Sequence, residues 1–379
     1  MKKKIAAFGF RSIPPQAGCA GADKFAEELF TRLVQRGYEV TAYNRVYEES
    51  NRQAGNYKGI KLVNLKTVKS KGFDTLLHSF KATWHIITRN TGDVVHIQNG
   101  GNSIWAVPLR LFGKKVFISQ DGVDWKRDKW PWYGKLYLYL STFLTARAPN
   151  AVIFDNIFAR DLFEKRFNKA YDFIPFGSEV SGENLDTSIL NKLGLTPGEY
   201  FLFVGRFIPD KGLQYLVPAF EKTSTGKKLV LVGGSPNPSS FETQIKATQD
   251  PRIVFPGFVY GGDVHALMKN AYAYIQPSDI EGLSPVILEN MGLQTPVICS
   301  DIKENLYVVD DTALTFKQGD IDDFARVLRF ALDNPDTLKD KAIKAKRRAA
   351  EKFSWEVVTD QHIMLFMADK HTKSADIPA

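Results

Sequence analysis

The sequence has few cysteines and no long hydrophobic run, and both scarcities narrow the class of protein. Cys19 and Cys299 are the only cysteines in 379 residues, too few for a disulfide framework and too far apart for a zinc-binding pattern. No apolar stretch approaches the ~20 residues that a membrane-spanning helix requires. The first apolar run is short and meets Arg11, which predicts a buried strand rather than a secretory signal. We therefore expect a protein of a reducing compartment, the cytoplasm.

Several common nucleotide and metal motifs are also missing. The chain has no G-x-x-x-x-G-K-[ST] sequence, which excludes a P-loop, and no G-x-G-x-x-G after a predicted strand, which argues against a Rossmann dehydrogenase. Its six histidines are scattered without the spacing of metal ligands. We therefore expect neither a metal site nor a bound cofactor. The 44% of hydrophobic and 24% of charged residues are typical of a folded globular chain.

Charge is unevenly distributed along the chain. Residues 1–180 hold 28 basic and 16 acidic side chains, a balance of +12, whereas residues 181–379 hold 22 and 26, a balance of −4. This asymmetry predicts that the first half meets something anionic, such as nucleic acid, a membrane surface or a phosphorylated acceptor. An ordinary solvated basic face is the alternative.

Apolar runs alternate with helical patterns in two successive series, which predicts an α/β fold of two doubly wound, Rossmann-like domains. The turn-forming residues between Pro175 and Pro197 place the boundary between an N-terminal domain, 1–178, and a C-terminal domain, 179–355. A terminal helix of about 356–379 is expected to pack back on the first domain. The predicted strands are 5–10, 39–43, 60–64, 94–97, 115–118 and 151–154, then 200–204, 228–232, 253–255, 273–276, 296–299 and 313–316.

A first candidate site follows the predicted strand 200–204. Gly205 would let a phosphate approach the backbone, and the start of the next helix offers free N–H groups and the positive end of its dipole. Arg206 and Lys211, five residues apart around this turn, can converge on one diphosphate. The alternative is a pair of solvated surface cations.

A second candidate site follows the predicted strand 273–276. Glu281 lies in a loop rich in glycine, serine and proline, and Glu289 lies one to two turns into the next helix. A carboxylate in such a loop can accept hydrogen bonds from sugar hydroxyls, and one on the following helix can hold both hydroxyls of a ribose. Two glutamates eight residues apart also occur commonly by chance.

Together, these two motifs resemble those of the retaining glycosyltransferases of family 4. Residues 205–212, GRFIPDKG, are similar to the GR-xxxx-KG element of that family, and residues 281–289, EGLSPVILE, are similar to its E-x7-E element. The resemblance implies the GT-B architecture, in which two Rossmann-like domains face a deep interdomain cleft. The donor would bind mainly to the C-terminal domain and the acceptor to the N-terminal domain.

The resemblance also implies roles for individual residues. Arg206 and Lys211 would hold the donor diphosphate, Glu281 would face the transferred sugar, and Glu289 would bind the nucleotide ribose. Val259 lies in a segment similar to the loop that contacts the nucleotide base. The implied catalytic residues are Arg206, Lys211, Glu281 and Asp121. The implied donor-binding residues are Gly18, Gly21, Gly205, Arg206, Lys211, Val259, Glu281, Gly282, Leu283, Ser284 and Glu289.

The first half resembles bacterial polysaccharide glycosyltransferases with a rhamnosyltransferase-like N-terminal module. Its small-residue loop, which contains Gly18 and Gly21, is implied to lie near the donor phosphate, although the subgroup usually has two adjacent glycines there. Asp121, in a segment similar to DG-x-EW-KR-x-KW, stands where many relatives have a histidine that touches the donor sugar. We expect it to contact sugar hydroxyls or the acceptor hydroxyl; a turn carboxylate is the alternative.

Two further features carry open alternatives. His96 ends a predicted strand and either lines the cleft or is a buried imidazole. Residues 126–139 interleave basic and aromatic side chains, which predicts contact with an anionic membrane surface or a lipid diphosphate acceptor. The alternative is a helix with one packed aromatic face and one solvated basic face. No nucleic-acid-binding module accompanies these residues, so we expect no nucleic-acid partner.

We therefore expect a retaining hexosyltransferase of bacterial polysaccharide synthesis, cytoplasmic and peripheral at the inner face of the membrane. It would move a hexose from a nucleotide diphosphate sugar to a hydroxyl of a saccharide or lipid-linked saccharide. UDP-glucose is the first expectation for the donor, from its frequency in the family, and a dTDP-rhamnose-dependent rhamnosyltransferase is the alternative. Alternatives of another class are a nucleotide-sugar epimerase and a non-catalytic nucleotide-sugar-binding protein.

Overall fold

The computed structural model describes residues 3–16, 21–48, 55–70, 72–123, 125, 131–178, 185–235 and 239–368. It divides into two compact units, of which the first comprises Met1–Gly177 with Trp355–Ala379 and the second Ser178–Ser354. Each unit is built on a sheet of its own. The last helix of the chain therefore belongs to the same unit as the first strand.

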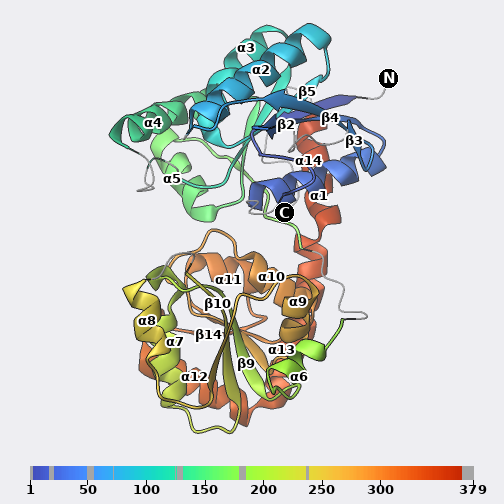
Figure 1. The fold of residues 1–379 in the computed structure, drawn as a ribbon. Helices are drawn as coiled ribbons and strands as arrows, with labels where there is room; N and C mark the ends of the chain where they lie inside the picture. The colour runs from blue at the N-terminus through green and yellow to red at the C-terminus, as the bar shows by residue number, and fades with distance from the viewer. Residues whose placement is uncertain are drawn as a thin grey trace. The chain divides into compact units, whose positions relative to one another are not determined.

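The first unit contains an eight-stranded sheet in the order β3-β4-β2-β1-β5-β6-β7-β8 (Figure 1). Neighbouring strands are parallel except for the antiparallel pair β3 and β4. Strands β2, β4 and β3 lie on one side of β1, and strands β5, β6, β7 and β8 lie on its other side. The strands are β1 Lys4–Phe8, β2 Glu39–Val46, β3 Asn56–Tyr57, β4 Ile60–Lys66, β5 Val94–Gln98, β6 Lys115–Gln120, β7 Ala151–Phe154 and β8 Asp172–Phe173.

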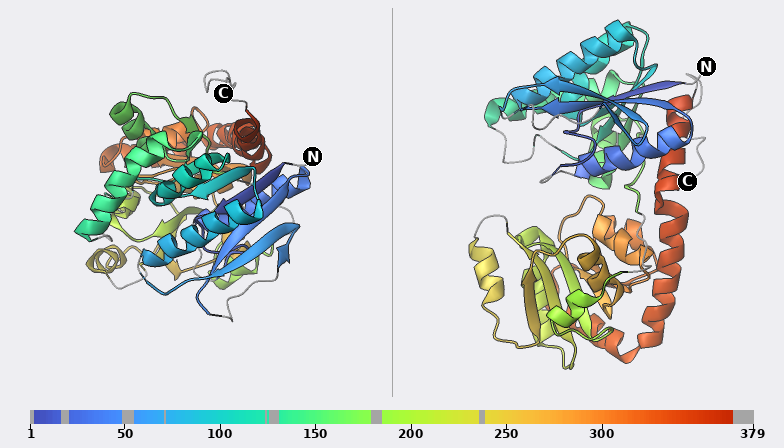
Figure 2. Two further views of the ribbon diagram at one scale, coloured as in Figure 1. Left: turned by 90° about the horizontal axis from the view of Figure 1, so that it is seen from above. Right: turned by 45° about the vertical axis from the view of Figure 1, so that its right-hand side comes forward.

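Helices cover both faces of this sheet (Figure 2). Because side chains alternate along a strand, Ile5 and Ala7 of β1 pack with α1 and α14, whereas Ala6 and Phe8 pack with α2 and α3. Strands buried on both faces are nearly continuous apolar runs, as the sequence predicts. The helices are α1 Gly21–Gln35, α2 Phe73–Arg89, the 3₁₀ helix η2 Gly100–Trp105, α3 Ala106–Leu111, α4 Trp132–Arg147, α5 Ile157–Phe167 and α14 Trp355–Met367.

Helix α14 is held against α1 by apolar packing, with ion pairs at its edge. Trp355 is buried in the same cluster as Phe25. At the rim, Glu356 accepts from Arg32 at 3.2 Å and from Arg36 at 2.5 Å. Because Glu356 is more than half exposed, these pairs contribute little to stability, and the buried aromatic contacts carry the attachment.

The second unit contains a six-stranded parallel sheet in the order β11-β10-β9-β12-β13-β14. This is the strand order of a doubly wound dinucleotide-binding fold, in which the direction of building reverses between β9 and β12. The strands are β9 Tyr200–Arg206, β10 Lys228–Gly234, β11 Ile253–Gly257, β12 Ala273–Gln276, β13 Val297–Ser300 and β14 Leu314–Phe316.

Helices also cover both faces of the second sheet. Tyr200 and Leu202 of β9 are buried with α9, α10 and α13, whereas Phe201 and Phe203 are buried with α7 and α12. Asp320 begins α12 by accepting hydrogen bonds from the first backbone N–H groups of that helix. The helices are α6 Ser188–Lys192, the 3₁₀ helix η4 Pro209–Lys211, α7 Leu213–Glu221, α8 Ser240–Lys246, α9 Gly262–Lys269, α10 Pro285–Gly292, α11 Lys303–Val309, α12 Ile321–Asp333 and α13 Pro335–Phe353.

All twelve strands expected from the sequence are present, with ends displaced by at most three residues. Strands β3 and β8 were not expected, because two residues are too short to show an alternating pattern. Strand β1 ends at Phe8, two residues before its expected end. Gly9 follows with a φ of 108°, and a Cβ atom there would lie 2.2 Å from the carbonyl oxygen of Gln98. The close approach of β5 therefore requires a glycine at this position.

Three buried histidines lie in the first unit. His96 is completely buried, its Nε2 lies 2.7 Å from the Ser119 hydroxyl, and its ring packs against those of Phe30 and His362. Of the two alternatives from the sequence, the structure thus shows a buried imidazole. Burial lowers the pKa of His96 and of His78 to about 3 and that of His362 to about 4. Each ring is therefore held neutral at pH 7 by the cost of burying a charge.

We expect the first unit to lose stability as the pH falls from 7 to 5. The unfolded chain binds protons at these histidines below about pH 6.5, whereas the folded unit does not bind them until the pH approaches 3 to 4. Each histidine thus lowers the free energy of unfolding by up to about 1.4 kcal/mol per pH unit. Urea denaturation across this range, followed for the first unit, measures the slope.

The variant His362→Gln should make this slope shallower by about 1.4 kcal/mol per pH unit. Ile343→Gln, which changes an exposed and non-titrating residue of α13 in the second unit, is the matched control and should leave the slope unchanged. An equal slope for wild type and His362→Gln would contradict the explanation.

Candidate functional site

The sequence-predicted residues of the second unit lie where the order of its strands reverses. Strands β9 and β12 are neighbours in the sheet, and both run in the same direction. Arg206 is the last residue of β9, Lys211 ends the 3₁₀ helix η4 that follows it, and the loop after β12 carries Glu281. In doubly wound sheets, ligands bind beyond the carboxyl ends of the strands at such a reversal. The fold therefore places both motifs at the position where a ligand is expected.

The turn after β9 keeps its first cation accessible. Gly205 lies against Gly233 of β10, where a Cβ atom on Gly233 would be only 1.9 Å from the carbonyl oxygen of Gly205. Arg206 is the last residue of β9, and its side chain is exposed. Its guanidinium makes no hydrogen bond or ion pair with any residue that the structure describes. Arg206 is thus available for an anionic ligand.

The two loops are fastened to each other through the backbone. Asp279 donates its N–H to the carbonyl oxygen of Asp210 at 2.9 Å. Gly212, which has a φ of 72° and precedes α7, packs so closely that a Cβ atom would lie 1.9 Å from the carbonyl oxygen of Pro277. Only glycine satisfies both the positive φ and this contact. The position of Lys211 is therefore fixed relative to the loop after β12.

Lys211 and Glu281 form the central ion pair of the site. Lys211 Nζ lies 2.5 Å from Glu281 Oε1, and the Glu281 side chain is only 8% exposed. The same oxygen accepts from Ser278 Oγ at 2.6 Å and from Gln276 Nε2. All three donors contact Oε1. The other carboxylate oxygen, Oε2, has no hydrogen-bond partner among the described residues. The carboxylate is thus oriented by the protein with one oxygen still available.

Gln276 is oriented in turn by a buried tyrosine. Tyr274 is completely buried and donates its hydroxyl to Gln276 Oε1, which leaves Gln276 Nε2 to face Glu281. Burial, together with the negative charges of Glu281 and Glu289, raises the pKa of Tyr274 well above its ordinary value. Tyr274 therefore remains a neutral hydrogen-bond donor, and the negative charges of both predicted glutamates help to keep its hydroxyl protonated.

Helix α10 positions the second glutamate. Ser284 is its N-cap and accepts from the Ile287 N–H at 3.4 Å, and Pro285 occupies the first turn, where its missing N–H costs nothing. Glu289 lies on the second turn of this helix and is half-buried. The intervening Gly282 and Leu283 form the end of the loop, and Leu283 packs against the core. The predicted serine thus has a capping role in this structure.

The loop after β11 presents two aromatic rings beside Val259. Val259 is half-buried and packs against the core, whereas Phe258 and Tyr260 are 51% and 75% exposed. Their rings are parallel within 2°, with centroids 6.1 Å apart. Phe258 and Val259 belong to the segment that resembles the base-contacting loop, whereas Tyr260 was not predicted, although an aromatic side chain next to them in a predicted loop was a usable signal.

Gln276, Ser278 and Tyr274 were also missed. Gln276 is a polar residue at the end of an otherwise apolar buried strand, which signals that its amide has buried partners. Nothing in the spacing, however, indicates that the partner is Glu281. That contact depends on how the loop after β12 folds back over the strand.

In the first unit, Asp121 also lies near a reversal of strand order. It follows β6, and its Oδ1 accepts from Gln98 Nε2 at the end of β5, at 2.9 Å. Gly21 is the first residue of α1. Gly18 and the stretch 126–130 lie outside the described residues. The roles assigned to Gly18, Gly21 and Asp121 stay predictions.

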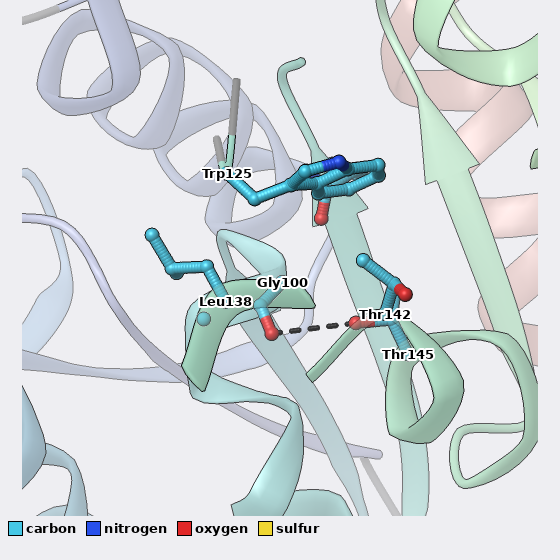
Figure 3. Close-up of a pocket in the computed structure, with 7 residues that line it drawn as sticks. Gly100, Trp125, Leu138, Thr142 and Thr145 are labelled. Carbon is cyan, nitrogen blue, oxygen red and sulfur yellow. Dashed lines mark hydrogen bonds between the residues drawn. The ribbon is translucent and has the colours of Figure 1, made fainter. Parts of the chain in front are cut away.

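A small pocket lies beside the Asp121 loop (Figure 3). It encloses about 10 Å³, which is room for one water molecule and not for a sugar ring. In Figure 3, Trp125 lies over Thr142 and Thr145, and Thr145 Oγ1 donates to the carbonyl oxygen of Gly100 at 3.3 Å. Gly100, Gly101, Gln120, Trp125, Leu138, Thr142 and Thr145 line this pocket.

Within the described part of the chain, no group of three or more histidine, cysteine, aspartate or glutamate side chains is arranged to hold a metal ion. The expectations of no metal and no cofactor stay predictions.

Comparison with known proteins gives a family for the second unit. Residues 187–349 match the family model of the glycosyl transferases group 1. The chain is similar to the O-antigen chain mannosyltransferase B of Escherichia coli, with 28% identity over 181 residues, 46% of this chain and 47% of the relative. It thus spans about half the length of that relative, and about half or less of the next most similar ones.

Solved structures extend the likeness to the whole fold. The sucrose-phosphate synthase of Thermosynechococcus elongatus superimposes with a TM-score of 0.77 at 18% identity, over 96% of this chain and 98% of the other. Anabaena HepE in complex with UDP-glucose superimposes with a TM-score of 0.71 at 14% identity, over 94% of this chain and 98% of the other. The α/β fold of two doubly wound units, with the GT-B architecture, is confirmed. Residues 187–349, the part that matches the glycosyl transferases group 1 model, lie within the second unit.

We expect Gly212→Ala to destabilise the second unit by about 3 kcal/mol or more. The substitution forces a side chain into a positive φ and pushes Cβ against the Pro277 carbonyl. Gly198→Ala is the matched control, because Gly198 has a φ of 74° and nothing lies within 4 Å of the added atom. This control should cost about 1 kcal/mol. Equal losses in urea denaturation would contradict the close packing of the two loops.

Proposed function

We propose that this protein is a retaining glycosyltransferase that moves a hexose from a nucleotide diphosphate sugar to a hydroxyl of a saccharide or lipid-linked saccharide. The observation that carries the proposal is the Lys211–Glu281 pair at the strand reversal of a glycosyl transferases group 1 domain. A cation and a carboxylate side by side suit a ligand with a diphosphate at one end and sugar hydroxyls at the other.

UDP-glucose is the donor that we propose first. Anabaena HepE, which shares this fold, binds UDP-glucose, and the similar E. coli protein is a mannosyltransferase. Both descriptions concern hexose chemistry, which supports a hexosyl donor here. A dTDP-rhamnose donor is the alternative, from the resemblance of the first half of the chain to rhamnosyltransferase-like modules.

In this proposal, Lys211 contacts both ends of the donor. An ammonium group has three N–H donors, and one of them is used on Glu281 Oε1 at 2.5 Å. The others are available to a phosphate oxygen, to which the Arg206 guanidinium, without a partner among the described residues, adds bidentate hydrogen bonds. Glu289, on the second turn of α10, is assigned to the ribose hydroxyls, and the loop of Val259 to the base.

Glu281 orients the sugar rather than attacking it. Its Oε1 is occupied by three donors, so Oε2 is the oxygen that accepts a hydrogen bond from a sugar hydroxyl. A carboxylate held this way has little freedom to approach the anomeric carbon. We therefore assign Glu281 a binding role in the transition state and not the role of a covalent nucleophile.

The proposed step exchanges one bond at the anomeric carbon. The bond between that carbon and the diphosphate oxygen breaks, and its electron pair leaves with the nucleoside diphosphate. The acceptor oxygen bonds to the same carbon from the face of the leaving group, so the configuration is retained, and its proton passes to the departing phosphate oxygen. Arg206 and Lys211 stabilise the negative charge that develops there. Asp121 is assigned to hydroxyls of the sugar or the acceptor.

We expect Arg206→Ala and Lys211→Ala each to lower kcat/KM by about 10²–10³-fold, because each removes a charge from the developing diphosphate. Release of nucleoside diphosphate in the presence of donor and acceptor measures turnover. Lys222→Ala, which removes an exposed lysine paired with Asp322, is the matched control and should retain wild-type activity. Unchanged turnover in Arg206→Ala or Lys211→Ala would argue strongly against the diphosphate assignment.

We expect Glu289→Ala to weaken the binding of free UDP by about tenfold, equivalent to about 1.4 kcal/mol, because it removes the partner of the ribose hydroxyls. Asp121→Ala, in the other unit, should bind UDP nearly as tightly as the wild type. Calorimetric titration of both variants makes the comparison. Equal affinities for the two would contradict the assignment of Glu289.

A further inference from the structure

Helix α4 has small, mostly polar residues on its buried side and mostly large apolar residues on its exposed side. Its buried residues are small and mostly polar, namely Ser141, Thr142, Thr145 and Ala146. Its exposed residues are mostly large and apolar, with 36–77% of each residue accessible: Trp132, Tyr133, Leu136, Tyr139, Leu140, Phe143 and Leu144. Arg147 is exposed as well. A helix on the surface of a globular protein normally has the opposite distribution. Within the described part of the segment 126–139, Trp132 and Tyr133 are exposed, whereas Tyr137 is half-buried and donates its hydroxyl to the Gly101 carbonyl. Both alternatives from the sequence stay predictions.

The inward hydroxyls are satisfied within the protein, so this orientation is a stable one. Ser141 donates to the Tyr137 carbonyl at 2.9 Å, Thr142 to the Tyr139 carbonyl at 2.7 Å, and Thr145 to the Ser141 carbonyl at 2.9 Å. Figure 3 shows the Thr142 and Thr145 side chains directed into the small pocket beneath the Trp125 ring. Small side chains allow α4 to approach η2 closely, while its bulky residues face outward.

The apolar surface continues onto the neighbouring helices. The Ser103 hydroxyl donates to the Ser141 carbonyl at 3.0 Å, and Arg110 donates to the Ala148 carbonyl at 3.0 Å, so η2 and α3 run beside α4. On η2 and α3, Ile104 and Leu111 are 40% and 80% exposed. Large exposed apolar patches usually mark an interaction surface.

The charged residues of α4 itself are positive. Helix α4 contains Lys135 and Arg147 and no acidic residue. Arg166 of α5 lies over the rings of Tyr139 and Phe143, at 4.3 Å and 4.9 Å from their centroids. The first 180 residues carry a balance of +12. A surface of aromatic and aliphatic side chains with a basic border matches the interface of a bilayer that contains anionic lipids.

We propose that α4 is a membrane-docking helix, whose outward apolar face inserts into the headgroup region of an anionic bilayer while its basic residues contact lipid phosphates. The helix lies in the plane of the membrane. Its 16 residues span about 24 Å, less than the bilayer core, and no helix in the described part of the chain has the length and apolar character to cross a membrane. Membrane docking by α4 goes beyond the proposed function. It rests on that function in one respect, the choice of a lipid-linked acceptor.

The test measures co-sedimentation of the full chain with vesicles of phosphatidylcholine, alone or with 30% phosphatidylglycerol. We expect binding to the anionic vesicles and little to the neutral ones. The double variant Leu136→Gln/Leu140→Gln should bind at least about tenfold more weakly, because it removes two inserting side chains. Ile343→Gln, which changes a 55% exposed residue of α13 in the other unit, is the matched control and should bind like the wild type.

Two further measurements separate the possible outcomes. The urea-unfolding midpoint of the first unit should be unchanged in the double variant, which shows that the unit carrying α4 is folded. UDP binding by the second unit is measured in parallel, and it separates a failure of membrane docking from a failure of the proposed function. Wild type that does not bind anionic vesicles, or a double variant that binds as well as wild type, would overturn the proposal. So would a wild-type dimer that the double variant converts to a monomer, since a second copy of the chain would then cover this face.

Discussion

The interaction on which the candidate site depends is the meeting of three donors at one oxygen of Glu281. Lys211, Ser278 and Gln276 all reach Oε1, although Lys211 is 70 residues away along the chain. A nearly buried carboxylate is costly unless it is paired and hydrogen-bonded, so the three donors are a condition of its burial and not an addition to it. Because they occupy one oxygen, the other is directed toward a ligand.

This arrangement follows from the topology of the sheet. Strands β9 and β12 are neighbours, so the turn that ends one and the loop that follows the other begin side by side. Backbone contacts between Asp210 and Asp279 and between Gly212 and Pro277 then hold the two segments together. A parallel sheet thus assembles a site from residues that are far apart in the sequence. The fully buried Tyr274 orients Gln276 by a hydrogen bond, and Gln276 in turn donates to Glu281.

The first unit also brings together segments that are far apart in the sequence. Its core encloses His96 and His362 as neutral rings, and its last helix returns from the far end of the chain to cover that core. On its surface, α4 directs small hydroxyl side chains inward and bulky apolar ones outward. Helix α14 thus packs large apolar side chains inward, whereas α4 packs small hydroxyl side chains inward. These hydroxyls can be buried because they donate hydrogen bonds to backbone carbonyls.

The sequence by itself predicted twelve of the strands and the α/β class, and it selected Arg206, Lys211, Glu281 and Glu289 as candidate site residues, because apolar runs and short motifs are local properties of a chain. Only the tertiary structure decided which groups meet: that Lys211 pairs with Glu281, that Gln276 orients it, that Ser284 caps a helix, and that His96 is buried. The direction of α4 was also decided there, since the apolar residues of this helix show little helical periodicity in the sequence. These outcomes depend on strand order and close packing between distant segments, which spacing along a chain does not encode.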